Sequence, residues 1–281
     1  MEPCAKVSLV TSTFENTRTG ERGPRSQNWR RPPTSALAME GVRAAGELSA
    51  MGALIPLLRR APKGDGHPVL VLPGFTAGDR STGPMRWFLR DRGYFTHGWK
   101  LGRNLGPTDR IIEGMRARVE ALLAQHGQRI TIVGWSLGGV YAREIARNAP
   151  DAVRQVITLG SPFRLTGRPG ASNAEPLFKL LSPMFTDAPP ERMTPEDRRP
   201  RLPVPATAIY TRTDGVVPWR SCVESTGSRR ESVEVKGSHS GLGHNPAVLL
   251  TIADRLAQPQ GTWRPFEPTA MWRRLGGVAT A

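Results

Sequence analysis

The chain is poor in cysteine and has no long apolar run. Its 281 residues include two cysteines, Cys4 and Cys222, which are too far apart in sequence to suggest a disulfide framework or a zinc site. Free thiols of this kind fit a reducing compartment. Because no stretch of about 20 consecutive apolar residues occurs, no transmembrane helix is expected. The N-terminus lacks the apolar region of a secretory signal, so we expect a cytoplasmic protein.

Lysine is also scarce. Five lysines stand among 39 basic residues, and the net charge of +15 therefore comes almost entirely from arginine. An excess of positive charge favours nucleic acid or an anionic membrane surface as partner. The arginines are spread along the chain, however, and no zinc-finger spacing, RNA-binding motif or basic helix accompanies them. We expect no nucleic-acid partner, while peripheral membrane contact through the basic N-terminal region and the oligomeric state stay open.

Composition divides the chain into segments. Residues 1–35 are polar, arginine-rich and without periodicity, which predicts a disordered or loosely attached tail. Residues 36–62 predict an amphipathic N-terminal helix. Residues 63–258 predict one α/β domain, in which the proline-rich interval 163–203 is a long insertion typical of a cap or lid. Residues 259–281 are a C-terminal tail that either wraps back on the domain or stays loose.

The face of the N-terminal helix is predicted from apolar spacings of three and four residues. Arg43 and Glu47 fall on the opposite side, and Arg59 and Arg60 near the C-terminal end suit the helix dipole. The pattern favours a helix packed on the core over one lying at a membrane surface. Its apolar face consists of Leu37, Gly41, Ala44, Leu48, Met51, Ile55 and Leu58.

Strand-like and helical segments alternate through the predicted domain. The strands are the apolar run in His67–Phe75, then Tyr94–Trp99, Arg129–Gly134, Val153–Leu159, Val204–Tyr210 and Val233–Val235. The helices are 84–92, a long helix capped by Asp109 with Ile111, Ile112, Met115, Val119, Leu122 and Leu123 on its inner side, Leu137–Asn148 and Pro246–Ala257. Such alternation predicts the α/β class, with a doubly wound, mostly parallel sheet.

The strongest chemical signal is the G-x-S-x-G motif Gly134-Trp135-Ser136-Leu137-Gly138. A predicted buried strand precedes the motif and a helix follows it, which is the context it requires. The tight turn holds the serine hydroxyl above the sheet, and glycine is needed where neighbouring backbone leaves no room for a Cβ. The pattern predicts Ser136 as a catalytic nucleophile.

A serine hydroxyl needs a base that takes its proton. Two histidines follow Ser136, both in the loop between the last predicted strand and helix, and His239 is favoured over His244 because it lies nearer the strand end. Asp214 ends a predicted strand, so it is favoured as the acid that orients the base, although an aspartate before glycine also suits an Asx turn. The competing acids, none of them at a predicted strand end, are Asp187, Asp197 and Glu224.

Acyl transfer also needs backbone N–H groups that bind an oxyanion. One is expected from Leu137, directly after the nucleophile, and the other from Phe75 in the loop after the first core strand, with Thr76 as second choice. The candidates for the substrate pocket are Thr76, Trp135, Leu177, Phe178, Leu181 and Phe185. A neighbouring group either lines the pocket or forms a structural turn, and it consists of Trp99, Arg103 and Asn104. No metal-binding or dinucleotide motif occurs, so no cofactor and no metal are expected.

The set LPGF, GWSLGG, TLGSP, RTDGVVP and GSHSGL resembles the lipase and esterase branch of the α/β-hydrolase superfamily, and the small bacterial triacylglycerol lipases in particular. The resemblance covers roughly residues 67–257. It implies a triad of Ser136, Asp214 and His239, and an oxyanion donor at Phe75. The chain departs from many of these lipases in having Pro73 where histidine is common, and the smallest members lack the insertion.

These residues predict a serine hydrolase that cleaves a small-molecule or lipid ester through an acyl-serine intermediate. The same triad also fits an acyltransferase, or a hydrolase of thioesters, lactones or amides. A non-catalytic binding protein with this fold is the remaining interpretation.

Overall fold

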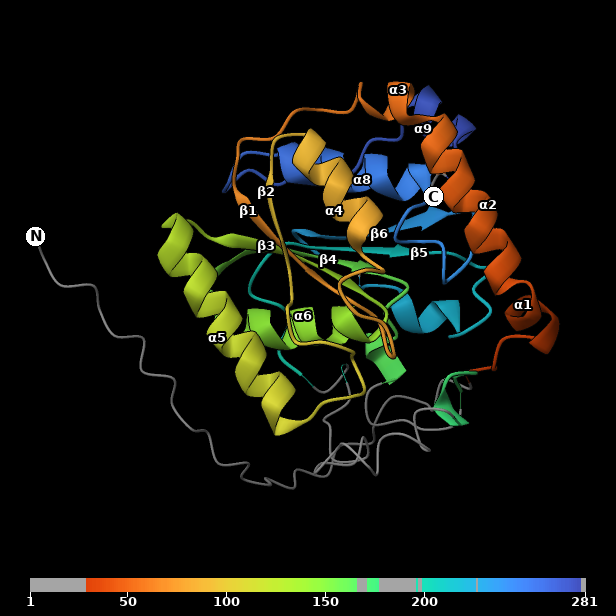
Figure 1. Cartoon of the computed structure of the whole chain (residues 1–281), viewed down its shortest axis with the longest axis horizontal. Helices are drawn as coiled ribbons and strands as arrows, with labels where there is room; N and C mark the ends of the chain where they lie inside the picture. The colour runs from red at the N-terminus through yellow and green to blue at the C-terminus, as the bar shows by residue number, and fades with distance from the viewer. Residues whose placement is uncertain (1–28, 166–170, 177–195, 197–198, 226, 279–281) are drawn as a thin grey trace, which may run out of the picture.

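The computed structural model describes residues 29–165, 171–176, 196, 199–225 and 227–278 (Figure 1). Its helices are α1 (Thr34–Ala38), α2 (Glu40–Ala53), α3 (Ile55–Leu58), α4 (Gly83–Asp91), α5 (Asp109–His126), α6 (Leu137–Asn148), α8 (Pro246–Ala257) and α9 (Ala270–Arg274), with 3-10 turns η1 (Phe163–Leu165) and η5 (Trp219–Cys222). Its strands are β1 (Pro68–Leu72), β2 (Phe95–Gly98), β3 (Ile130–Trp135), β4 (Val153–Leu159), β5 (Ala206–Tyr210), β6 (Arg230–Val235) and β7 (Gly277–Val278).

The strands form one sheet in the order β2-β1-β3-β4-β5-β6-β7. Strands β1 to β6 run parallel, and the short β7 pairs antiparallel with β6. From β1 the chain first moves to β2 at one edge and then returns across β1 to β3. The strand order therefore reverses between β1 and β3, and doubly wound sheets bind ligands outside the carboxyl ends of the strands at such a point.

Helices cover both faces of this sheet (Figure 1). Helices α5 and α6 pack on one face, while α2, α3, α4, α8 and α9 contribute to the cluster on the other. Side chains of β1 alternate between the two clusters, with Val69 and Val71 on one face and Leu70 and Leu72 on the other. Because both faces are covered, β1 is buried along its whole length and is continuously apolar, as the sequence indicated.

Helix α5 begins with a different cap from the predicted one. The N-cap is Thr108, whose hydroxyl accepts a hydrogen bond from the Ile111 N–H at 3.1 Å, and Asp109 is the first helical residue. Ile112, expected on the inner side, is 46% exposed. The buried side chains recur every three or four residues from Ile111 onward, and Ile112 lies outside that stripe. The buried residues of the helix are Ile111, Met115, Val119 and Leu122.

The N-terminal segment differs from the predicted single amphipathic helix. It forms α1, α2 and α3 in succession, and Leu37 and Leu48 are 40% and 47% exposed. Glu47, expected on the outer side, instead hydrogen-bonds the loop after β6, and so does Glu40. The predicted apolar face was therefore wrong at Leu37 and Leu48. Hydrogen bonds from backbone N–H groups of that loop to Glu40 and Glu47 determine which side of α2 faces the domain. In the C-terminal half of the segment, Met51 and Leu58 pack into the apolar core.

The described part of the C-terminal tail wraps back on the domain. The Trp272 side chain is buried against α8, and its Nε1 donates to Thr251 Oγ1 at 2.8 Å and to the Ala247 carbonyl at 3.1 Å. Strand β7 follows and extends the sheet beside β6. Of the two alternatives for this tail, the wrapped arrangement is therefore found over residues 259–278.

Two parts of the predicted organisation lie outside the described residues: most of the tail at residues 1–35 and most of the cap interval 163–203. The cap stays a prediction. Within the part of the chain that the structure describes, no helix has both the length and the apolar character that crossing a membrane requires.

Candidate active site

Ser136 stands at the turn between β3 and α6. Its backbone has φ 52° and ψ −121°, a strained conformation for a residue other than glycine. Glycine is required on both sides of the serine. A Cβ on Gly134 would clash with the backbone of Gly138 and Gly139, and a Cβ on Gly138 would lie 2.7 Å from the Pro73 carbonyl oxygen. The motif thus produces the tight turn that its glycines predict.

His239 and Asp214 form a buried pair at the same carboxyl edge of the sheet. The His239 Nδ1 lies 2.6 Å from Asp214 Oδ2. The other carboxylate oxygen, Oδ1, accepts backbone N–H bonds of 2.8 Å from both Val216 and Val217. Asp214 is therefore an Asx-turn residue and a partner of the histidine at once, and its own turn fixes the direction of Oδ2.

Gly160 connects this pair with the serine turn. Ser136 N–H donates to the Leu159 carbonyl at the end of β4 at 2.8 Å, and Gly160 is the next residue. A Cβ on Gly160 would lie 3.1 Å from His239 Nδ1 and 3.4 Å from Asp214 Oδ2, and its φ is +51°. Only glycine fits this position without strain. The sequence signal for this position is a glycine directly after a buried strand.

The imidazole of His239 has a shifted acidity. Burial alone lowers the pKa of the ring, but the charge of Asp214, the hydrogen bond with Asp214 and the charge of Glu40 outweigh it. The pKa of His239 therefore lies above the ordinary histidine value of 6.5. This arrangement favours the imidazolium form, which a base must adopt when it takes a proton.

Trp135, proposed above for the substrate pocket, is 8% exposed and belongs to the core. Its indole Nε1 donates to the backbone carbonyl of His239 at 3.0 Å. The ring of His244 packs edge-on against the indole, and the His244 Nε2 donates to the Ala44 carbonyl of α2 at 2.9 Å. The structure thus places Trp135 behind the histidine loop and ties His244 to α2.

Of the competing acids, the structure describes Glu224, which pairs with a different residue. Glu224 is buried in an ion pair with Arg143 on α6, with 2.5 Å between its Oε2 and the Arg143 Nη1. Asp187 and Asp197 lie outside the described residues. Asp214 is the carboxylate in contact with the His239 ring.

The loop after β1 brings Gly74 against the nucleophile, where an added Cβ would lie 3.2 Å from the Ser136 Cβ. The Thr76 N–H donates to the Asn104 carbonyl at 2.6 Å, so this N–H is already engaged, and Thr76 has a φ of +62°. Leu137 is the first residue of α6, where N–H groups have no partner within the helix. The engaged N–H counts against Thr76 as the second donor, and Phe75 stays a prediction.

Trp99, Arg103 and Asn104, for which the sequence allowed either a pocket lining or a structural turn, differ from one another in the structure. Trp99 is buried, with its Nε1 donating to the Gly102 carbonyl at 2.9 Å, and Arg103 is exposed. Asn104 is buried and supports the loop after β1, since its Nδ2 donates to the Pro73 carbonyl at 2.9 Å. The pocket candidates in the cap, outside the described residues, are Leu177, Phe178, Leu181 and Phe185.

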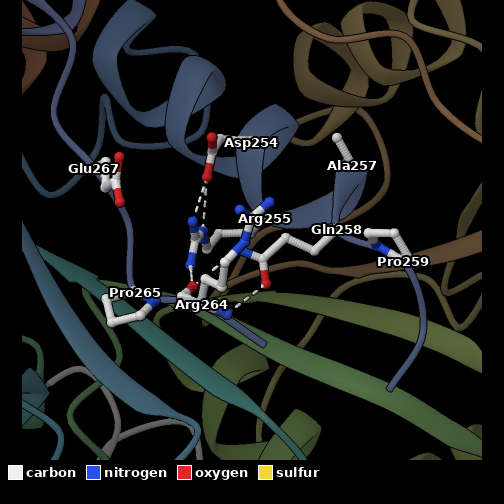
Figure 2. A pocket seen from close by; sticks show the side chains of 8 residues that line it. All are labelled: Asp254, Arg255, Ala257, Gln258, Pro259, Arg264, Pro265 and Glu267. Carbon is white, nitrogen blue, oxygen red and sulfur yellow. Dashed lines mark hydrogen bonds and ion pairs between the residues drawn. The ribbon is translucent and has the colours of Figure 1, made fainter. Parts of the chain in front are cut away.

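A cavity of about 220 Å³ lies elsewhere, around the C-terminal end of α8 (Figure 2). In Figure 2 the Arg255 guanidinium points toward Asp254 and toward the Arg264 carbonyl, to which it donates at 2.6 Å. Arg255 also pairs with Glu231 near the start of β6, which places the cavity toward the amino ends of the strands. The described residues around the cavity include none of the predicted site residues.

Sequence reasoning missed Glu40 and Gly160 as neighbours of the site. Glu40 is 5% exposed and hydrogen-bonds the backbone N–H of His239. Its only sequence signal was a charged residue at the start of a helix, which also suits the helix dipole. In the described part of the chain, no group of three or more histidine, cysteine, aspartate or glutamate side chains is placed to hold a metal ion.

Comparison with known proteins gives short sequence matches and broader structural ones. No family model matches the chain. A segment of 59 residues is 37% identical to a pimeloyl-(acyl-carrier protein) methyl ester esterase of Aliivibrio fischeri, covering 21% of this chain and 23% of that protein. The match therefore spans about a quarter of the length of this curated relative.

Two solved structures are similar over most of their own length. One, from work on the metagenome-derived lipolytic enzymes LipS and LipT, has a TM-score of 0.50 at 18% identity and covers 69% of this chain and 93% of that chain. A pyrethroid hydrolase from Sphingobium faniae has a TM-score of 0.51 at 22% identity, with coverages of 69% and 98%. The chain therefore has the α/β-hydrolase fold, and the fold class predicted from its sequence is confirmed. The two solved structures are named for lipolytic enzymes and for a pyrethroid hydrolase.

Proposed function

We propose that this chain is a serine hydrolase that cleaves carboxylic esters through an acyl-serine intermediate. The observation that carries the proposal is the 2.6 Å contact between His239 Nδ1 and the buried Asp214, at the same edge of the sheet as the strained turn of Ser136. A nucleophile turn, a base and an acid that orients the base are the parts that acyl transfer requires.

The acylation step follows from the position of the proton on His239. When Nδ1 donates to Asp214, the neutral ring keeps Nε2 free of a proton, and Nε2 can accept the proton of the Ser136 hydroxyl. The serine oxygen then bonds to the ester carbonyl carbon. As the tetrahedral intermediate collapses, the C–O bond to the alcohol breaks, and the alcohol leaves with the proton from His239.

Deacylation repeats these steps with water as the nucleophile. His239 takes a proton from water, the hydroxyl bonds to the acyl carbon, and Ser136 recovers the proton as the acid product leaves. In both halves the carbonyl oxygen becomes an oxyanion, which the N–H groups of Leu137 and Phe75 stabilise. The Leu137 donor has the additional advantage of the helix N-terminus, where the partial charge is positive.

An ester substrate is favoured by the names of the similar proteins, which include a methyl ester esterase and lipolytic enzymes. A lipophilic acyl group is favoured further by the apolar residues of the predicted cap. Acyl transfer to another acceptor uses the same residues, and a panel of esters and acceptors distinguishes it from hydrolysis.

The test is labelling with a fluorophosphonate, which reacts with activated serines. We expect the native protein to label and Ser136→Ala not to label, while its hydrolysis of a p-nitrophenyl ester falls by roughly 10⁴-fold or more. Ser49→Ala, on the solvent side of α2, is the matched control and should label like the native protein. A well-folded native protein that neither labels nor cleaves esters would refute the proposal.

A further inference from the structure

Glu40 lies between the two loops that carry the acid and the base. At the start of α2, its Oε1 accepts hydrogen bonds from the N–H of Gly215 at 2.8 Å and of His239 at 3.1 Å. Its Oε2 accepts the N–H of Ser240 at 2.8 Å. Gly215 directly follows Asp214 in the loop after β5, whereas His239 and Ser240 belong to the loop after β6. One buried carboxylate therefore joins both loops.

The Glu40 carboxylate is held in its charged form. Burial raises the pKa of the carboxyl, but the three backbone donors and the nearby His239 outweigh burial and hold the pKa below its ordinary value. Arg43, one turn further along α2, donates from Nη2 to Glu40 Oε1 at 2.9 Å and to the Thr213 carbonyl at 2.8 Å. A negative charge thus stands directly behind the backbone of His239.

Other ionisable groups pack around the same histidine, and they reach it from four elements. Among the described residues, these groups are Asp214 after β5, Glu40, Arg43 and Glu47 on α2, His244 in the loop of His239, and Cys222 on η5 beside Asp214. Glu47 binds the ends of the loop, since it accepts the Ser238 N–H at 2.7 Å and the Asn245 Nδ2 at 2.9 Å. Among these ionisable groups, Asp214 contacts the ring of His239, and Glu40 accepts the backbone N–H of His239.

We propose that Glu40 is a positioning residue for His239, and that its charge favours the imidazolium that forms during turnover. The inference rests on the proposed hydrolase function. Its hydrogen bonds hold the loop of His239 against the turn of Asp214, so that the ring keeps its 2.6 Å contact with the carboxylate. Its charge acts through space on the same ring, in the direction in which Asp214 acts.

The test compares Glu40→Gln with the native protein in two measurements. The first is kcat/KM for a p-nitrophenyl ester from about pH 5 to about pH 9, which reports the acidity of the base in the free enzyme. The second is an NMR titration of the His239 ring, which needs no substrate. We expect Glu40→Gln to lower kcat on the order of tenfold or more, because a displaced base is costly. We also expect the acid limb and the ring titration to move to lower pH.

Three further variants distinguish the effect of Glu40 on His239 from a general loss of stability and from the loss of any one negative charge. Glu47→Gln removes a carboxylate from the same helix and the same loop, and should lower Tm while the acid limb keeps its native position. Glu113→Gln removes an exposed charge from α5 and should leave both measurements unchanged. Glu40→Asp keeps the charge on a shorter side chain, so kcat should fall while the acid limb stays near its native position.

The outcomes decide the inference in each case. A folded Glu40→Gln variant with native kcat and a native acid limb overturns it. If Glu40→Gln does not fold, Glu40→Asp decides, and native kcat in that variant overturns it. Should the native protein fail to react with a fluorophosphonate, the proposed hydrolase function fails separately, and the ring titration still reports whether Glu40 acts on His239.

Discussion

The indole Nε1 of Trp135 donates a 3.0 Å hydrogen bond to the backbone carbonyl of His239. The residue before Ser136 therefore holds the main chain of His239, the proposed base. Trp135→Phe removes this donor and leaves a buried carbonyl unpaired, so we expect the free energy of unfolding to fall by about 1–3 kcal/mol and kcat to fall as well. Urea unfolding and ester kinetics measure the two effects.

Trp272→Phe is the matched control for Trp135→Phe. It also removes a buried indole donor, but the acceptors of this indole, Thr251 and Ala247, belong to α8. It should lower stability while kcat stays native. Equal losses of kcat in both variants would show that the Trp135 contact has no particular effect on the base.

Asp214→Asn tests the orientation of the base. The amide keeps an acceptor for Val216 and Val217 through its oxygen, but it turns an NH₂ group toward His239 Nδ1. The ring then favours the tautomer with its proton on Nε2, and kcat should fall on the order of 10⁴-fold. Asp151→Asn on the surface should keep the native rate. A loss of less than tenfold in Asp214→Asn would contradict the assigned role.

Asn104→Ala tests the support of the oxyanion loop. It leaves the Pro73 carbonyl and the Tyr141 hydroxyl without this partner, so the loop that carries Phe75 loses a side-chain hydrogen bond at its start. We expect kcat to fall by about 100-fold with little change in KM, since a misplaced donor affects the transition state. Tyr141→Phe removes one hydroxyl from the same network and should cost far less. Equal effects of the two variants would exclude a role for the Pro73 bond.

The raised pKa of His239 gives opposite trends for rate and stability. Only the neutral ring accepts the serine proton, so kcat/KM should increase with pH through a pKa above 6.5. Because the folded-state pKa is raised, the ring contributes its full stabilisation below the unfolded pKa and loses it as pH rises through the folded pKa. Rate profiles, together with Tm of the native protein and of His239→Gln across pH, test both trends. An acid limb below 6.5 would contradict the electrostatic account.

Local patterns were sufficient for the parallel strands of the sheet and for the turn at Ser136. The strand β1 is predictable because Val69 to Leu72 are apolar in succession, which is what burial on both faces requires. The turn at Ser136 is predictable because its glycines act on neighbours within a few residues. Asp214 and His239 could be assigned from their positions after predicted strands, and the structure brings their side chains into contact.

The orientation of α2 could not be predicted in this way. Apolar periodicity places Glu47 outside, yet its partners are Ser238 and Asn245, almost 200 positions away in the chain. The same holds for Asn104, whose partner carbonyl at Pro73 is 31 positions away. Unpaired N–H and carbonyl groups in distant loops determine where these side chains point, and spacing within one segment carries no information about them.

The bonds from Glu40 to Gly215 and to Ser240 join residues 175 and 200 positions apart. During synthesis, α2 leaves the ribosome before the first strand of the sheet, and its two partner loops follow only after β5 and β6. A growing chain can complete the turn of Ser136 long before it possesses a proton acceptor held in place. The proposed activity would therefore appear only when the beginning of the domain has packed against its last loops, and a chain released early would carry Ser136 without a positioned His239.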